Sequence, residues 1–184
     1  MITAVANSNI AIIKYWGNSN DERVIPANNS ISFTMDDQLQ TKTSIKFDSK
    51  FKKDELFFNG KKAKEIETKR ASYLLNILRK KAKSKLKAKI HSWNSFPTSA
   101  GLASSASGFA ALTAAASKSL GLNLSLKELS IYSRFGSGSA ARSIFGGAVE
   151  WIRDNSPYAK QLVPKEKLKN LRNVIAIIEK KEKK

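Results

Sequence analysis

The sequence has 184 residues, of which 41% are hydrophobic and 26% charged; this is the composition of one globular domain, and it excludes disordered and collagen-like chains. It has no cysteine and a single histidine, His91, which excludes disulfides, Cys-ligated zinc and thiolate catalysis and argues against a Ser-His-Asp triad. The net charge is +18, no apolar run approaches the roughly 18 residues of a membrane span, and no secretion signal is recognisable, so we expect a cytoplasmic protein.

The first third of the chain has the pattern of short strands. Residues 3–15 alternate and then become apolar, which predicts one or two strands broken at residues 7–9. Residues 17–30 are rich in turn-forming residues. Three β-branched and aromatic segments follow and predict strands, the last of them ending in a turn at Asn59-Gly60: residues 31–35, 41–47 and 55–60.

The rest of the chain alternates between helical and strand patterns. Helices are predicted over residues 64–83, 103–120 with Gly121 at its C-terminal end, and 126–135, where Ser125 and Glu128 form a capping box. Strands are predicted over residues 87–95, at the end of 141–151 after a short helix, and over 173–179, with a loop after Pro157. This order of elements predicts a mixed α+β domain.

The positive charge is concentrated in two stretches. Residues 46–89 hold 14 Lys and 2 Arg against 5 acidic residues, and residues 160–184 hold 8 Lys and 1 Arg against 3. The lysines between residues 80 and 89 lack the interleaved aromatic residues that stack on bases. We therefore interpret the charge as a solvated lysine-rich face and do not expect a nucleic-acid partner, with an RNA-facing or membrane-facing patch as the alternative.

The segment PTSAGLASSASG at residues 97–108 joins the predicted strand 87–95 to the helix that begins near residue 103. Small residues at a helix start expose backbone N–H groups, which together with the helix dipole favour a phosphate. Gly101 and Ala103 would let the phosphate approach, and Ser104 or Ser105 could add a hydroxyl donor or a magnesium ligand. A tight strand–helix corner would need the same small residues.

Three blocks of the sequence carry a more specific resemblance. They are residues 9–36 (NIAIIKYWG followed by IPANNSISFTMD), residues 94–108 (NSFPTSAGLASSASG) and residues 133–151 (SRFGSGSAARSIFGGAVEW). Together they resemble, in order and spacing, the diphosphomevalonate decarboxylase branch of the GHMP kinase superfamily. The resemblance implies a ribosomal protein S5 domain 2-like N-terminal domain, with helices packed on a mixed sheet.

The resemblance also implies the roles of individual residues. The ATP phosphates and Mg²⁺ would meet the first loop, with Ser104 or Ser105 as the metal ligand: Pro97, Ser99, Ala100, Gly101, Leu102, Ala103, Ser104 and Ser105. The substrate would meet residues from all parts of the chain: Lys14, Tyr15, Trp16, Gly17, Asn18, Arg70, Ser137, Gly138, Ser139, Ala140, Ala141 and Arg142. Arg142 would grip the carboxylate, because a guanidinium offers two parallel donors. Taken without the family, residues 136–142 would also suit a flexible turn.

One position departs from the family pattern. Family members usually have Lys after the glycine of KYWG, and this chain has Asn18. The substitution removes a positive charge from the diphosphate end of the site. It leaves open whether the substrate is mevalonate 5-diphosphate, the monophosphate or free mevalonate.

The implied activity is ATP-dependent decarboxylation of mevalonate 5-diphosphate to isopentenyl diphosphate, in isoprenoid biosynthesis. The alternatives are a mevalonate or phosphomevalonate kinase, a phosphomevalonate decarboxylase and, outside enzymes, a basic S5-like nucleic-acid-binding domain. The family aspartate that acts on the 3-hydroxyl has no match here, and Asp36, Asp37 and Asp154 do not align with it. We therefore expect residues 1–184 to be an N-terminal domain without its C-terminal GHMP domain, inactive alone and homodimeric when complete.

Overall fold

The computed structural model describes residues 1–97 and 102–175. In chain order its elements are β1 (Ile2–Asn7), β2 (Asn9–Ile13), β3 (Asn18–Asn20), β4 (Ile25–Pro26), β5 (Ser30–Thr34), β6 (Gln40–Asp48), β7 (Glu55–Phe58), β8 (Lys61–Lys62), α1 (Glu65–Ala82), β9 (Lys87–Asn94), α2 (Ser104–Ser119), α3 (Leu126–Ser133), the 3₁₀ helix η1 (Gly138–Ile144), β10 (Ala148–Ile152), β11 (Tyr158–Val163) and the 3₁₀ helix η2 (Lys165–Leu168).

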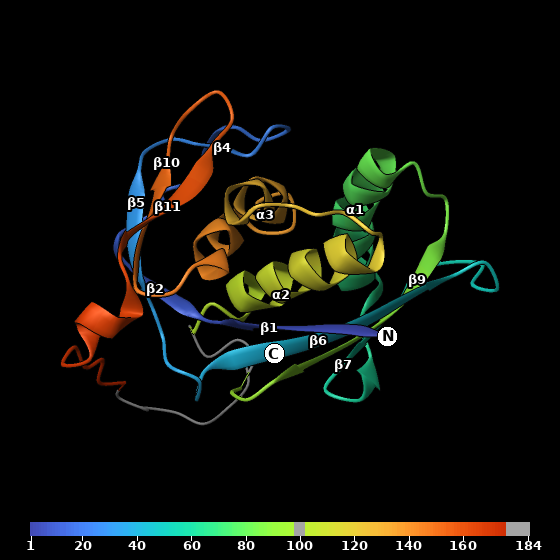
Figure 1. Ribbon diagram of the computed structural model, residues 1–184, viewed down its shortest axis with the longest axis horizontal. Coiled ribbons are helices and arrows are strands. Elements are labelled where there is room, and N and C mark those ends of the chain that lie inside the picture. Colours follow the sequence, from blue (N-terminus) through green and yellow to red (C-terminus); the bar gives the residue numbers. More distant parts are fainter. Residues whose placement is uncertain (98–101, 176–184) are drawn as a thin grey trace.

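The fold has two main sheets. One has the order β1-β6-β9-β7-β8, with β7 and β9 parallel and the other pairs antiparallel. The second is antiparallel with the order β11-β10-β5-β2. In Figure 1 the three α-helices lie on one face of the first sheet, and the second sheet stands at the end where α2 begins. The predicted α+β class with a mixed sheet is confirmed; the second sheet was not anticipated.

The main core forms where α1 and α2 pack on the inner face of the first sheet. Alternation along β6 and β9 turns Ile45 and Ile90 inward, and Leu74, Leu75 and Leu78 of α1 cover them; all five are fully buried. Helix α2 presents alanines, whose small side chains let it lie close to β1 and β6. Burial of this surface fixes α2, and with it the loop that precedes α2.

Turn and cap signals in the sequence are confirmed where the structure describes them. Asn59 and Gly60 both have positive φ and close the β7–β8 hairpin. Gly121 has φ +73° just after α2. The Ser125 hydroxyl accepts a hydrogen bond from the Glu128 N–H, and the Glu128 carboxylate accepts from the Ser125 N–H, so the capping box at α3 is present.

Three boundaries differ from the sequence prediction. The prediction of a loop after Pro157 is wrong, because Tyr158–Val163 forms a strand at the sheet edge that pairs with β10. Few of its side chains are buried, so its sequence does not show the apolar alternation of a strand. Helix α3 ends at Ser133 instead of residue 135, because the chain tightens into i→i+3 bonds at Phe135 and Gly136. The strand expected at 173–179 is irregular over 173–175, and the remainder lies outside the described residues.

Candidate functional site

The N-terminus of α2 faces the second sheet (Figure 1). The helix begins at Ser104, directly after Ala103, which has φ +51° in the left-handed region. The hydroxyl of Ser8, at the β1–β2 break, donates to the carbonyl of Leu102 and fixes the entry to the helix. Of the predicted phosphate loop, Ser99, Ala100 and Gly101 lie outside the described residues. The described part offers free N–H groups and the positive end of a 16-residue helix, which suits a phosphate.

A cavity of about 400 Å³ opens beside this helix start. Its polar wall includes Arg70, Ser104 and Ser105. Its apolar wall comes from Leu56, Phe58, Phe109 and Leu112. A mixed wall of this kind, with a cation and a helix N-terminus at one end, suits a ligand that has a flat apolar part and an anionic part.

Arg70 of α1 connects three parts of this site. Its Nη2 donates to the Gly136 carbonyl at 2.8 Å, and its guanidinium lies 5.1 Å from the centre of the Phe109 ring of α2. A Cβ on Gly136 would lie 2.0 Å from that ring, so only glycine fits there. Arg70 was predicted to contact the substrate; the structure places its guanidinium beside Gly136 and Phe109, and its contact with a substrate stays a prediction.

A row of hydroxyls joins α2 to η1. Ser105 Oγ lies 3.3 Å from Ser137 Oγ, which lies 3.1 Å from Ser139 Oγ. The Ser139 carbonyl accepts from Asn9 Nδ2 at 3.2 Å, which ties the row to β2. The two loops that the sequence placed about thirty residues apart thus share one edge of the site.

Arg142 of η1 is buried, with 2% of its surface exposed. Its Nη1 donates to Ser30 Oγ at 2.6 Å and its Nε to Ser32 Oγ at 3.1 Å, both on β5. None of the ion pairs found within residues 1–97 and 102–175 includes it. Burial lowers the pKa of Arg142 to about 10. A buried guanidinium with only hydroxyl acceptors is costly, so the arrangement favours an anionic ligand.

Tyr15 forms a second wall near Arg142. Its ring packs edge-on against Trp151 at 5.0 Å, and a Cβ on Gly138 would lie 2.9 Å from Trp151 and 3.2 Å from Tyr15. The Tyr15 hydroxyl donates to Asn18 Oδ1, and Asn18 Nδ2 donates to Asp21 at 3.0 Å. Burial raises the pKa of Tyr15, the Asp21 charge adds to the increase, and Arg142 opposes it.

Some predicted site residues contribute no free side chain to this arrangement. Lys14 is exposed and donates to the Ala11 carbonyl at 2.7 Å, and Trp16 is 80% exposed. Ala140 and Ala141 are fully buried, backbone included, so neither residue presents accessible surface to a ligand. Gly17 has φ +113°, and it serves the turn after Tyr15. Pro97 is exposed at the end of β9.

The groups that hold Arg142 were not among the predicted site residues. Ser30 and Ser32 are 112 and 110 residues away from it; Ser30 was assigned to a turn-rich stretch and Ser32 to a strand, and neither was predicted as a site residue. Trp151 is fully buried, and its Nε1 has no hydrogen-bond partner among the described residues. The one available signal is the alternation of inward and outward side chains along β5 and β10, which places Ser30, Ser32 and Trp151 on the sheet face that η1 covers.

The described residues contain no group of three or more His, Asp or Glu that could hold a metal ion. Mg²⁺ commonly takes one or two protein ligands and completes its shell with phosphate and water. The hydroxyls of Ser104 and Ser105 at the helix start fit that mode, provided that a nucleotide supplies the phosphates.

Comparisons with known proteins agree on one family. Residues 6–162 match the family model of the diphosphomevalonate decarboxylase-like N-terminal domain. The diphosphomevalonate decarboxylase of Candida albicans is 40% identical over an alignment of 193 positions, and the alignment covers 96% of this chain and 53% of that protein. A structure of the mevalonate diphosphate decarboxylase from Enterococcus faecalis has a TM-score of 0.84 at 45% identity, covering 88% of this chain and 51% of that one.

A further structure, described as MDDEF in complex with MVAPP, AMPPCP and magnesium, has a TM-score of 0.83 at 45% identity and covers 88% of this chain and 50% of that one. The chain therefore spans about half the length of these relatives. Within its described residues, no helix has both the length and the apolar character that crossing a membrane requires.

Proposed function

Since the chain belongs to the diphosphomevalonate decarboxylase-like family by its N-terminal domain, we propose that the protein converts mevalonate 5-diphosphate to isopentenyl diphosphate in an ATP-dependent decarboxylation. The observation that carries the proposal is the buried Arg142 guanidinium, which has two serine acceptors and no acidic partner among the described residues. The proposed substrate has a carboxylate that supplies the missing charge.

The geometry supports the following proposed division of the site. Arg142 holds the substrate carboxylate, and Tyr15 and Trp151 form the wall beside it. The hydroxyl row from Ser105 to Ser139 lies between Arg142's helix and the start of α2, and it donates to the phosphates of the bound molecules. Each of these groups is fixed by strands or helices before a ligand arrives, so little reorganisation is needed on binding.

The nucleotide is proposed to occupy the 400 Å³ cavity, with its phosphates at the α2 N-terminus. Arg70, held by the Gly136 carbonyl, adds a positive charge at that end, and Ser104 or Ser105 would hold Mg²⁺. ATP and Mg²⁺ supply the phosphoryl group that turns the 3-hydroxyl into a leaving group. This chain's residues bind and orient the substrate, so that the carboxylate and the 3-hydroxyl keep a fixed relation.

One observation favours a second candidate, the decarboxylation or phosphorylation of a less phosphorylated mevalonate. Asn18 is neutral, its side chain is bound to Tyr15 and Asp21, and Asp21 brings a negative charge to this end of the site. A carboxylate there repels a diphosphate more than a monophosphate.

Isothermal titration calorimetry tests the proposal on the 184-residue chain. Mevalonate 5-diphosphate, the monophosphate and mevalonate are titrated into the wild-type chain and into Arg142→Lys. We expect Arg142→Lys to weaken all three ligands by roughly 10- to 100-fold, as expected for a charged hydrogen bond worth about 1.5–3 kcal/mol. If Arg142→Lys bound all three ligands as tightly as the wild type does, Arg142 would not belong to the site. The order of the wild-type affinities separates the two candidates.

A further inference from the structure

The outer face of the five-stranded sheet has no role in the small-molecule site. Helices α1 and α2 cover the inner face, to which Thr43, Ile45 and Ile90 point. Among the described residues, no helix lies on the other face, which is the lower side of the sheet in Figure 1. Strand alternation assigns the outer side chains of β6 and β9: Lys42, Ser44, Lys46, Lys87, Lys89, His91 and Trp93.

Three aromatic rings stand in a row on this outer face. The Phe57 and His91 rings are 4.9 Å apart and 11° from parallel, and the His91 and Trp93 rings are 5.7 Å apart and 14° from parallel. Phe57 pairs with His91 across the parallel β7–β9 ladder. Trp93 ends the row and is 43% exposed. The row therefore presents a flat aromatic face to solvent at the Trp93 end.

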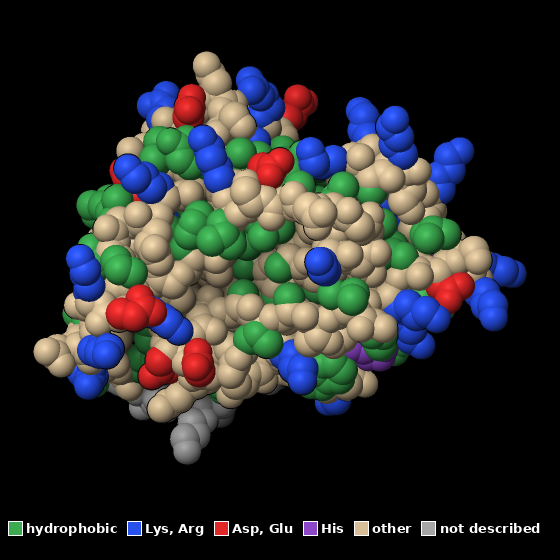
Figure 2. Space-filling model, viewed as in Figure 1, with side chains coloured by type: hydrophobic (Ala, Val, Ile, Leu, Met, Phe, Trp, Pro, Cys, Tyr) green, Lys and Arg blue, Asp and Glu red, His purple; other side chains and the backbone are tan. Residues whose placement is uncertain are grey.

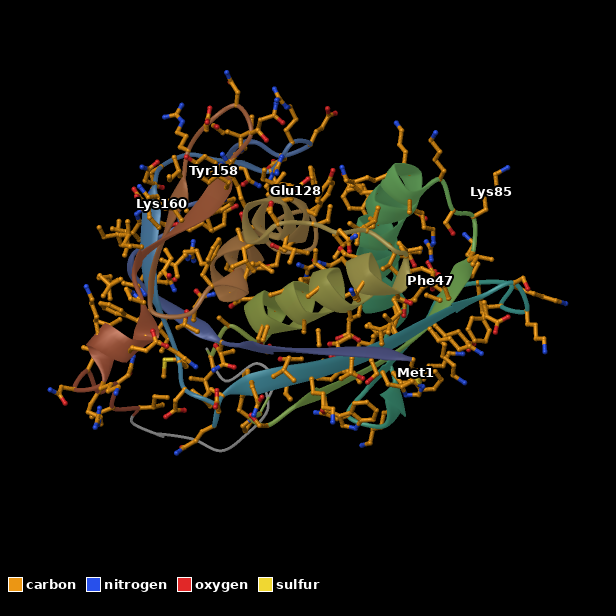
Figure 3. All side chains as sticks on the ribbon, viewed as in Figure 1. Met1, Phe47, Lys85, Glu128, Tyr158 and Lys160 are labelled. Carbon is orange, nitrogen blue, oxygen red and sulfur yellow. The ribbon has the colours of Figure 1, made fainter. Side chains whose placement is uncertain are left out.

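Lysines surround the row. Lys42 is directly opposite Trp93 in the β6–β9 register, and Lys89 Nζ lies 5.1 Å from the centre of the Phe57 ring. The outer positions also include three further lysines and two acidic residues: Lys46, Lys62, Lys87, Asp48 and Glu55. Figure 2 shows basic and hydrophobic side chains together with the histidine at the lower right; Lys85, which Figure 3 shows on the helix side of the sheet before β9, does not belong to this face. The face is thus both basic and aromatic.

We propose that this outer sheet face binds single-stranded nucleic acid, with a base stacked on Trp93 and the backbone phosphates on Lys42 and Lys89. Exposed aromatic rings on a sheet stack on bases whatever their sequence, and lysines along the same surface follow the phosphate backbone. The sequence did not predict such a surface because no aromatic residue stands among the lysines at 80–89. The register of β6, β7 and β9 brings three aromatic residues from separate parts of the chain to the same face as the lysines: Phe57, His91 and Trp93.

The chemistry of the face favours nucleic acid over a lipid surface or a second copy of the chain. Thr3 and Ser44 share the face, and their hydroxyls are 2.7 Å apart, so its centre is polar as well as aromatic. Val5, which lies opposite Lys42 and is 51% exposed, is a single aliphatic side chain among lysines and gives too little apolar surface for membrane insertion. Two copies of one lysine-rich face would repel each other. A flexible polyanion with flat bases satisfies both the rings and the lysines.

The test uses fluorescence anisotropy of a labelled oligouridine of about 12 nucleotides, a length within the range that one binding surface occupies. The wild-type chain should bind with a Kd on the order of 10⁻⁵ M. Trp93→Ala should weaken binding about tenfold without changing its dependence on salt, and Trp93→Phe should restore most of the affinity. Lys42→Gln/Lys89→Gln should reduce the slope of log K against log salt by about 1.4, as expected for two lost phosphate contacts.

Matched controls lie on other surfaces. Tyr73→Ala removes a half-exposed ring from α1, and Lys160→Gln/Lys167→Gln removes two charges near β11; neither should change the affinity or the slope by more than its error. Circular dichroism and thermal unfolding confirm that every variant is folded. If the control and sheet variants lose affinity equally, binding is a general effect of net charge and the proposal is wrong. Binding to phosphatidylserine vesicles but not to the oligonucleotide, or dimerisation that Trp93→Ala abolishes, would likewise overturn it.

Discussion

Two of the buried arginines, Arg134 and Arg142, have opposite environments. The Arg134 guanidinium donates to the backbone carbonyls of Arg23, Ile131 and Pro157, so it satisfies acceptors that the fold would otherwise leave unpaired. Among the described residues, the Arg142 side chain donates to the Ser30 and Ser32 hydroxyls, which could bond elsewhere. Burial lowers the pKa of both side chains to about 10. The first arginine serves the fold, and the second is better explained by a ligand.

This difference predicts opposite effects of the same substitution. Arg142→Met removes a buried unpaired charge and should raise the free energy of unfolding by about 1–3 kcal/mol. Arg134→Met leaves buried carbonyls without donors and should lower it by about 1–3 kcal/mol. Urea denaturation of the two variants measures both changes. A loss of stability in Arg142→Met as large as that in Arg134→Met would make Arg142 a structural residue.

Asn18 allows a test of substrate choice. Asn18→Lys adds a positive charge beside Tyr15 and Asp21, and we expect it to strengthen binding of mevalonate 5-diphosphate more than that of the monophosphate or mevalonate. Asn18→Gln keeps the amide without the charge and is the matched control. Affinities from calorimetry decide the point. An equal gain for all three ligands would show that Asn18 does not face the diphosphate.

Motif residues were the part of the site that the sequence could indicate. Ser137, Ser139 and Arg142 lie within six residues of each other, so their proximity needs no knowledge of the fold. The partners of Arg142, Ser30 and Ser32, come from β5, which pairs with β10 in the second sheet and lies far along the chain from η1. A contact between residues more than a hundred positions apart depends on sheet order, which local patterns do not contain.

At the scale of elements, α3 sets where the 136–142 segment starts. Its capping box holds the Glu128 carboxylate by the Ser125 N–H and hydroxyl, and these hydrogen bonds lower the pKa of Glu128. A carboxyl whose pKa is lowered by folding stabilises the fold above its unfolded pKa, and this contribution disappears as the pH falls through the folded value. The helix start is therefore a source of pH-dependent stability.

We expect Glu128→Gln to be less stable than the wild type at neutral pH, with a difference that shrinks as the pH falls below about 4. Ser125→Ala should keep the larger part of the pH dependence, since the Ser125 N–H still donates to Glu128. Thermal unfolding across the acidic range measures both. A stability deficit of Glu128→Gln that stays constant with pH would show that the carboxylate does not hold this cap.

Helices and inner strands followed from their patterns, while edge elements did not. Helix α1 and strand β9 match the prediction within one residue because apolar spacing and alternation are strong there. Strand β11 was missed because it is a sheet edge with largely exposed side chains, so hydrophobicity does not mark it. The same limit hid the aromatic row, which depends on register across β7 and β9.

At the scale of the whole molecule, the candidate site lies where the two sheets meet the helix layer (Figure 1). Helix α1 contributes Arg70, α2 the serines at its start, η1 Arg142, and the β2–β3 segment Tyr15. These groups come from four separate parts of the chain. The site therefore forms only when the whole domain is folded, and a ligand that contacts all four parts would stabilise their packing.

The central claim is that Arg142 meets the carboxylate of mevalonate 5-diphosphate, and NMR of ¹⁵N-arginine-labelled chain tests it directly. Three buried arginines donate a hydrogen bond through Nε: Arg142 to the Ser32 hydroxyl, Arg134 to the Arg23 carbonyl and Arg79 to the Leu86 carbonyl. The Nε–Hε signal of Arg142 therefore reports on the site, and those of Arg134 and Arg79 are internal controls. On titration with mevalonate 5-diphosphate, the Arg142 signal should shift to saturation while those of Arg134 and Arg79 stay in place. An Arg142 signal that does not move at a ligand concentration that saturates the chain would contradict the account.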